Sequence, residues 1–184
     1  MTSLSICIPT FNRCYFLKSA LKSIQQAVCE LDLLDRVEVC VSDNASVDQT
    51  REVIEEISIE DPCLRLKYYR NPSNLGFGPN LWKAIELAKT DYVLLMGDDD
   101  SLDGHNLREV LSILESQKPD LLLLNSEPGH LVDDSRSGFR GDFMPINNIG
   151  QYLSDLGVFH ASFIGNLLLR RAFWMAIPID SYIS

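Results

Sequence analysis

The stretch from Tyr92 to Asp100 reads YVLLMGDDD, a continuous apolar run followed by a glycine and three aspartates. A short apolar run that stops at a turn residue is typical of a strand buried on both faces of a sheet. Gly97 lets the backbone turn sharply where the strand Tyr92–Met96 ends. The sequence therefore predicts a buried strand that is followed directly by three carboxylates.

Two earlier runs share this arrangement of a buried strand and a polar end. Leu4–Pro9 reads LSICIP and precedes the polar segment Thr10–Arg13. Val37–Val41 reads VEVCV and precedes the polar segment Ser42–Asn44. Weaker runs predict three further strands, at Leu64–Tyr69, Asp120–Asn125 and Ile164–Leu169. Because ligands bind outside the carboxyl ends of the strands in open α/β sheets, we expect the polar clusters to face one crevice.

Between the strands, apolar residues recur at spacings of three and four, which predicts amphipathic helices. We expect them from Asn12 to about Val28, from the N-cap Asp48 to about Ile57, from about Leu81 to Ala88 and from about Asn106 to Gln117. Strands that alternate with helices indicate an α/β fold, a mostly parallel sheet with helices on both faces. We interpret residues 1–184 as a single domain, with a polar loop or lid at Glu127–Asn148 and a short helix at Ile149–Leu156.

The composition excludes several classes of protein. Apolar residues make up 46% and charged residues 23% of the chain, as in an ordinary globular domain. The formal net charge of −10 argues against nucleic-acid binding, which needs a basic surface. No apolar run approaches the roughly 20 residues of a bilayer span, and no signal peptide begins the sequence. The five cysteines have no C-x-x-C spacing, so we expect reduced thiols in a cytoplasmic protein rather than zinc ligands or disulfides.

The triplet Asp98–Asp100 is the sharpest chemical signal in the chain. Three adjacent carboxylates repel one another, and a hard divalent cation is the simplest compensation. Magnesium and manganese prefer oxygen ligands and are often bound by one or two carboxylates together with substrate phosphates. The alternative is a solvated loop in which Asp100 or Asp103 caps the next helix.

Other polar residues at the strand ends have two interpretations each. Asp43 either accepts hydrogen bonds from backbone amides of its own turn or from a base or sugar hydroxyl of a ligand. Thr10 and Asn12 are either ligand contacts or helix caps. Arg13 and Arg70 are either phosphate partners or solvated arginines. The three histidines, His105, His130 and His160, have no ligand spacing and are expected to be ordinary surface or core residues.

The order and spacing of four motifs resemble the family 2 glycosyltransferases of the GT-A fold. The motifs are SICIPTFNR at Ser5–Arg13, VSDNASVD at Val41–Asp48, NLGF at Asn74–Phe77 and GDDD at Gly97–Asp100. The resemblance covers about residues 3–126, and Phe163–Trp174 is more loosely similar to a later part of the family. The GDDD variant resembles transferases that build bacterial surface polysaccharides, including some that move dideoxy sugars onto lipid-linked O-antigen units.

The resemblance implies roles for particular residues. The pocket for the nucleotide sugar would be lined by Pro9, Thr10, Phe11, Asn12 and Arg13. Asp43 would contact the base or the ribose, and the segment Asn74–Asn80 would close the pocket beside the base and phosphates.

The acidic motif, of the type called DXD in this family, would bind the rest of the donor. Asp98 and Asp99 would contact the nucleotide sugar, and Asp99 and Asp100 would hold Mn²⁺ or Mg²⁺ on the diphosphate. Gly97 stands where the family pattern D-x-D-D has its first aspartate.

The activity implied is the transfer of a sugar from a nucleotide-sugar donor to a hydroxyl acceptor, metal-assisted and inverting. The acceptor would be a glycan or a lipid-linked sugar in O-antigen or capsule synthesis, with peripheral association at the inner face of the plasma membrane. The family's catalytic base lies near the end of its domain. Here Asp180 lacks that context, so we expect the domain to be truncated and assign no base.

Two alternatives to the transferase stay open. One is a non-catalytic or decayed homologue that keeps a nucleotide-sugar pocket. The other is a nucleotidyltransferase, which needs a glycine-rich basic loop after the first strand. The sequence PTFNR at Pro9–Arg13 has no glycine, which disfavours the second alternative.

Overall fold

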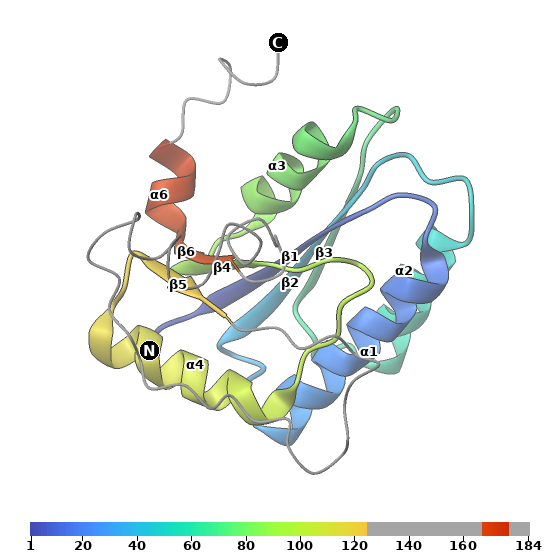
Figure 1. Ribbon diagram of the computed structural model, residues 1–184. Coiled ribbons are helices and arrows are strands. Elements are labelled where there is room, and N and C mark those ends of the chain that lie inside the picture. Colours follow the sequence, from blue (N-terminus) through green and yellow to red (C-terminus); the bar gives the residue numbers. More distant parts are fainter. Residues whose placement is uncertain (125–166, 177–184) are drawn as a thin grey trace, which may run out of the picture.

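The computed structural model describes residues 1–124 and 167–176 of the 184-residue chain, apart from the side chains of residues 105, 106 and 123. A six-stranded sheet in the order β3–β2–β1–β4–β6–β5 forms its centre (Figure 1). The strands are β1 (Leu4–Thr10), β2 (Val37–Asp43), β3 (Leu66–Arg70), β4 (Tyr92–Leu95), β5 (Leu121–Leu123) and β6 (Leu167–Arg170). The helices are α1 (Cys14–Glu30), α2 (Thr50–Glu60), α3 (Phe77–Leu87), α4 (Gly104–Gln117) and α6 (Arg171–Ala176).

The register of the parallel strands brings the polar segments to one edge of the sheet. Thr10 pairs with Asp43 where β1 and β2 end. β4 is shorter, since Leu95 pairs with Cys7 in the middle of β1 and the Met96 amide donates to the Cys7 carbonyl at 3.0 Å. The residues after Met96 therefore run beside the last residues of β1.

β6 is the antiparallel member of the sheet. It pairs antiparallel with β4, Tyr92 opposite Arg170, and with β5, Leu122 opposite Leu168. Leu168 is fully buried, so β6 fills the sheet between two parallel strands. The expected α/β fold with a mostly parallel sheet is confirmed, and β6 is the exception within it.

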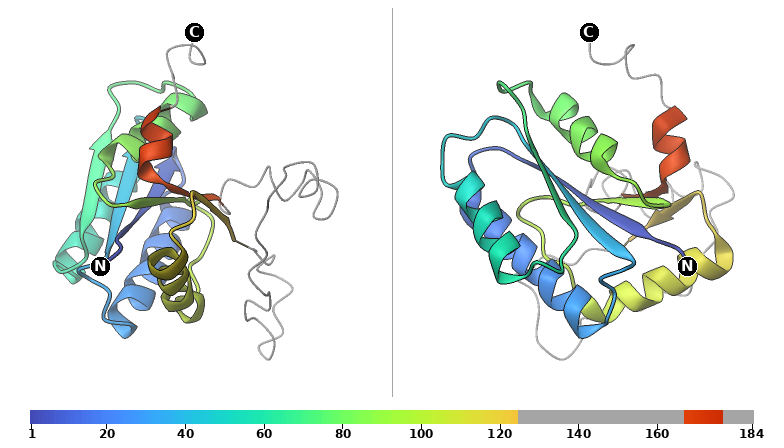
Figure 2. Two further views of the ribbon diagram at one scale, coloured as in Figure 1. Left: turned by 90° about the vertical axis from the view of Figure 1, so that its left-hand side faces the viewer. Right: turned by 180° about the vertical axis from the view of Figure 1, so that it is seen from behind.

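Helices cover both faces of the sheet, as predicted (Figure 2). On one face, α1, α2 and α4 bury residues such as Leu17, Ile57 and Leu111 against alternate strand residues, including Ile6 and Val39.

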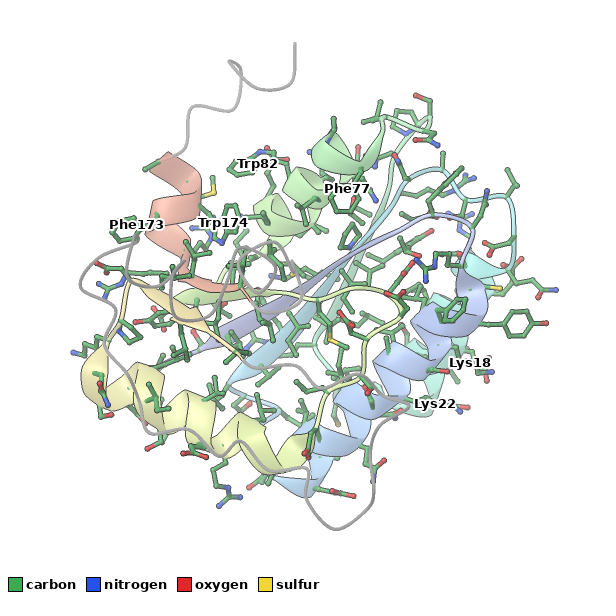
Figure 3. The ribbon with its side chains drawn as sticks, in the orientation of Figure 1. Lys18, Lys22, Phe77, Trp82, Phe173 and Trp174 are labelled. Carbon is green, nitrogen blue, oxygen red and sulfur yellow. The ribbon has the colours of Figure 1, made fainter. Side chains whose placement is uncertain are left out.

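On the other face, α3 and α6 lie over the second set of strand residues. Cys7, Cys40 and Leu95 pack there against Ala84 and Ile85 of α3. Trp82 of α3 and Trp174 of α6 are packed against this cluster (Figure 3). The strands are thus apolar on both faces, which is why their sequences are continuous rather than alternating apolar runs.

Two helix boundaries differ from the prediction for local reasons. α1 begins at Cys14 and not at Asn12, because Asn12 has a φ of 53° and is left-handed. α3 begins at Phe77 and not at about Leu81. Pro79 is compatible with this start because a proline in the first turn of a helix replaces an amide that has no helical partner.

Several predictions fall on residues that the structure does not describe. The loop or lid at 127–148 and the helix at 149–156 lie outside the described residues, as do His130 and His160. Among the helices in the described part of the chain, none is long and apolar enough to cross a membrane.

Candidate functional site

A cavity of about 710 Å³ opens at the carboxyl ends of β1 and β4, beside the first turn of α3. Its volume is within the range of roughly 300–1,000 Å³ that is usual for small-molecule sites. The lining residues are Pro9, Thr10, Phe11, Arg13, Asn44, Asn74, Gly76, Phe77, Asn80, Met96, Gly97, Asp98, Asp99 and Asp100. The cavity therefore lies at the edge of the sheet where the sequence predicts a ligand.

Most of the predicted site residues meet at this cavity, and two of them do not. Asn12 and Asp43 are absent from its lining. Asn44 and Met96 line it although the sequence analysis did not select them. For Asn44 the signal was its position directly after a buried strand, the same signal that drew attention to Asp43.

The turn Gly97–Asp100, called the acidic turn below, follows β4. Its first aspartate, Asp98, is buried and links the end of β4 to β1. Thr10 Oγ1 donates a hydrogen bond of 2.7 Å to Asp98 Oδ2, and Arg13 Nε lies 3.3 Å from Asp98 Oδ1. Burial raises the pKa of Asp98, and the negative charge of Asp99 raises it further. The hydrogen bond from Thr10 and the charge of Arg13 lower it, but the net effect is a raised pKa. Asp98 is therefore a fixed part of the cavity wall.

Asp99 is half exposed and is paired with Arg13. Arg13 Nη2 donates to Asp99 Oδ2 at 2.7 Å, and this bond raises the pKa of Arg13. The guanidinium carbon of Arg13 also lies 4.7 Å from the centre of the Phe16 ring, a cation–π distance. Arg13 is thus held by carboxylates on one side and an aromatic ring on the other.

Gly97 makes room for the carboxylates that follow it. Asp100 Oδ2 accepts a hydrogen bond of 2.9 Å from the Gly97 amide. A Cβ atom on Gly97 would lie 2.8 Å from both Asp100 Oδ2 and Asp99 Oδ1, closer than real contacts allow. The two side chains therefore fold back over Gly97, and their oxygens converge on the same side of the turn.

The oxygen atoms of this turn are a suitable donor set for a hard divalent cation. Magnesium is usually bound through one or two carboxylates plus phosphate oxygens rather than by a complete cage of protein ligands. In the described part of the chain, no group of three or more His, Cys, Asp or Glu residues is arranged to hold a metal ion. An ion held by Asp99 and Asp100 would take its remaining ligands from water or from a bound phosphate compound.

Side-chain amides fix another part of the cavity wall. Asn44 Nδ2 donates to Asn74 Oδ1 at 2.7 Å, and the Leu75 amide donates to Asn44 Oδ1 at 2.9 Å. Asn80 Nδ2 donates to the Thr10 carbonyl at 3.2 Å. These bonds attach the loop before α3 and the helix itself to the ends of β1 and β2.

A glycine in this wall has a conformation that side chains disfavour. Gly76 has a φ of +86° immediately before α3 begins, and its carbonyl accepts a hydrogen bond of 3.1 Å from Asn44 Nδ2. A residue with a Cβ would be strained at this φ, so glycine lets the loop enter α3.

Comparison with known proteins identifies the family. The family model described as Glycosyl transferase family 2 matches residues 5–174. The chain belongs to this family. Abequosyltransferase RfbV of Salmonella typhimurium is 35% identical over 98% of this chain and 56% of that protein. This family 2 chain therefore spans little more than half the length of that relative.

Solved structures agree on the fold. Staphylococcus aureus TarS 1–349 in complex with UDP-GlcNAc matches with a TM-score of 0.72 and 21% identity, over 95% of this chain and 47% of that chain. The mannosyltransferase PcManGT of Pyrobaculum calidifontis, in complex with GDP-Man and Mn²⁺, matches with a TM-score of 0.60 and 21% identity, over 67% and 35% of the chains. The family 2 chain has the GT-A fold predicted from its motifs.

In this family 2 fold the carboxylate of Asp43 is hydrogen-bonded to neighbouring residues of the protein. The Ser46 amide donates to Asp43 Oδ1 at 2.8 Å, which confirms the hydrogen bond within its turn. Tyr68 Oη donates to Asp43 Oδ2 at 2.7 Å, and Arg70 Nε lies 3.4 Å from the same oxygen. Burial and the bond to Asp43 raise the pKa of Tyr68. Arg70 is thus engaged by Asp43, and a contact between Asp43 and a nucleobase stays a prediction.

Asn12 connects the loops that follow β1 and β2. Asn12 Oδ1 accepts from the Val47 amide at 2.8 Å, and the Asn12 amide donates to Ser46 Oγ at 2.9 Å. Asp48 continues the connection, because its carboxylate accepts from the amides of Cys14 and Thr50, the first residues of α1 and α2. The N-cap of α2 is Gln49 and not Asp48 as predicted, because the helix begins one residue later; Asp48 instead links the starts of two helices.

Proposed function

We propose that this chain is the donor-binding domain of a glycosyltransferase that moves a sugar from a nucleotide sugar to a hydroxyl acceptor. The observation that carries the proposal is the convergence of Asp99 and Asp100 over Gly97, inside a cavity at the carboxyl ends of β1 and β4. Membership of family 2 and the likeness to an abequosyltransferase support this chemistry.

The acidic turn is proposed to hold the diphosphate end of the donor through Mn²⁺ or Mg²⁺ bound to Asp99 and Asp100. A divalent cation there stabilises the negative charge that builds on the leaving nucleoside diphosphate. Asp98, held by Thr10, keeps the turn in place, and Gly97 allows the two ligands to reach the same point. The Mn²⁺ complex of PcManGT supports the choice of metal.

The remaining wall is proposed to receive the nucleoside. Phe11 and Phe77 line the cavity and are 39% and 59% exposed, so they offer apolar ring surface to a flat base. Pro9, Asn74 and Asn80 complete this side of the cavity. The complex of TarS with UDP-GlcNAc supports a nucleotide sugar as the ligand class.

We further propose an acceptor that is a glycan or lipid-linked sugar of a bacterial surface polysaccharide, and an inverting reaction. The general base is not assigned to any described residue. We propose that residues 1–184 form one domain. We also propose that the protein lies in the cytoplasm, at the inner face of the plasma membrane. Five free cysteines, two of them exposed, support a reducing compartment.

The proposal is tested by thermal unfolding of the protein with UDP-, GDP-, CDP- and dTDP-sugars and with nucleoside triphosphates, each with and without Mn²⁺. A ligand that binds only the folded state raises the melting temperature. We expect at least one nucleotide sugar to raise it with Mn²⁺ and much less without. Protection by nucleoside triphosphates alone would indicate a nucleotidyltransferase, and the absence of protection by every donor would contradict the proposal.

Turnover separates the transferase from a non-catalytic binding homologue. The donor found by thermal unfolding is incubated with Mn²⁺ and lipid-linked or soluble sugar acceptors, and the release of nucleoside diphosphate is measured. Release that depends on an acceptor supports a transferase, whereas metal-dependent binding without release supports the binding homologue.

A further inference from the structure

Arg13 is the one positively charged residue among the described residues that line the cavity. Three aspartates, Asp98–Asp100, line the same cavity. Its Nε lies 3.3 Å from Asp98 Oδ1 and its Nη2 lies 2.7 Å from Asp99 Oδ2. Both contacts use the carboxylates of the acidic turn that is proposed to hold the metal. Arg13 therefore partly neutralises this turn in the metal-free protein.

We propose that Arg13 is an internal counter-cation that competes with the divalent metal for the acidic turn and moves to the donor diphosphate when the metal is bound. This inference rests on the proposed function. According to this inference, Arg13 lowers the affinity of the acidic turn for a metal ion alone. It raises the affinity of the turn for a metal ion together with a nucleoside diphosphate. Arg13 thereby couples the binding of the two ligands.

The position of Arg13 suits such a movement. Its side chain is 41% exposed, and it lies directly before α1 without capping that helix through its side chain. A half-exposed ion pair contributes little to stability, so the contact with Asp99 is easily exchanged for another. Phe16, itself exposed, offers the guanidinium a surface outside the carboxylates.

Charge balance explains the coupling. A divalent ion placed beside Asp99 and Asp100 is repelled by the guanidinium of Arg13 as long as that group stays at Asp99. A diphosphate supplies a new anionic partner to which a guanidinium forms bidentate hydrogen bonds. Arg13 can therefore leave Asp99 at lower cost when the diphosphate is present than when the metal arrives alone.

The test uses Arg13→Met, which removes the charge and keeps an apolar side chain of similar length. Lys18→Met is the matched control. Lys18 lies on α1 (Figure 3), is paired with Glu56 of α2 and does not line the cavity. Both variants remove one positive charge from the protein. The affinity for Mn²⁺ alone, and for Mn²⁺ with a saturating nucleoside diphosphate, is measured by titration calorimetry or by the paramagnetic resonance of free Mn²⁺.

We expect Arg13→Met to bind Mn²⁺ alone roughly 3–30-fold more tightly than the Lys18→Met control, a difference that added salt reduces. The factor by which the nucleoside diphosphate improves Mn²⁺ binding should fall in the same variant. Arg13→Lys, which keeps the charge, should restore most of the wild-type behaviour. A residue that only supports the shape of the turn would change Mn²⁺ binding in the opposite direction.

The outcomes separate this inference from the proposed function. If Arg13→Met binds Mn²⁺ alone no more tightly than Lys18→Met, the counter-cation role is wrong while the metal site stands. If the wild-type protein binds no Mn²⁺ in the presence of UDP, GDP, CDP or dTDP, the proposed function fails. Should Arg13→Met not fold, Arg13→Gln, which retains hydrogen-bond donors for Asp98, provides the same comparison.

Discussion

Thr10 Oγ1 and Asp98 Oδ2 are joined by a hydrogen bond of 2.7 Å that links residues 88 positions apart. Thr10 ends β1, and Asp98 follows β4. Both side chains are almost fully buried, although both residues line the cavity. This bond fixes the position of the acidic turn relative to the rest of the cavity.

Replacing Thr10 by valine tests this bond. Valine has nearly the same shape and no donor, so Asp98 would lose its hydrogen bond from Thr10 and keep the longer side-chain contact with Arg13. We expect a loss of about 1–3 kcal/mol in the free energy of unfolding, the cost of leaving a buried acceptor unpaired. Urea unfolding measures it, and Thr10→Ser should recover most of the loss. A change within about 0.5 kcal/mol would show that the bond does not hold the turn.

Replacing Gly97 by alanine tests the convergence of the carboxylates. The added Cβ would displace the carboxylates of Asp99 and Asp100, which can rotate away once their bonds to Arg13 and the Gly97 amide break. We therefore expect a folded protein that binds Mn²⁺ with a nucleoside diphosphate at least about tenfold more weakly. Gly78→Ala is the control, because nothing lies within 4 Å of a Cβ at Gly78. Equal metal affinity in both alanine variants would contradict the geometry of the turn.

The stability of the protein should depend on pH through Glu38, which is fully buried at the other end of the sheet. Burial alone would raise its pKa, but hydrogen bonds from Lys67, Ser5 and the Lys89 amide outweigh burial and lower it. A lowered pKa means that this stabilisation is present above the unfolded pKa of about 4.5 and is lost as the pH falls through the folded value.

Glu38→Gln separates this contribution from general acid unfolding. We expect the variant to be less stable than wild type by about 1–3 kcal/mol at pH 7, since the charged hydrogen bonds are lost. The difference should shrink as the pH falls from about 4.5 toward the lowered folded pKa, because Glu38 is protonated first in the unfolded chain and, at the folded pKa, in the native protein as well. Urea unfolding at several pH values measures this, and a gap that stays constant or widens toward low pH would show that another group is responsible.

The features that were predictable from the sequence depend on local patterns. The runs around Ile6, Val39 and Leu94 are apolar on both faces, so they indicated buried parallel strands and placed the polar residues at their ends. Gly97 followed by aspartates indicated a turn with carboxylates, and its motif pointed to the correct family.

The features that were not predictable depend on pairing between distant residues. The direction of β6 and its place between β4 and β5 follow from contacts such as Leu168 with Leu94, which no local pattern encodes. The engagement of Asp43 by Tyr68, and of Asp99 by Arg13, likewise needs the register of the sheet. A sequence shows which side chains reach the edge of the sheet, but not which of them are already paired there.

The most direct test of the central claim compares donor binding to the wild-type protein and to the double variant Asp99→Asn, Asp100→Asn, with and without Mn²⁺. A control double variant, Asp32→Asn with Asp35→Asn, makes the same charge change on exposed residues outside the cavity. Titration calorimetry should show Mn²⁺-dependent binding of a nucleotide sugar to the wild type and the control, and no effect of Mn²⁺ on the Asp99 and Asp100 variant. Mn²⁺-dependent donor binding that persists in that variant would contradict the account.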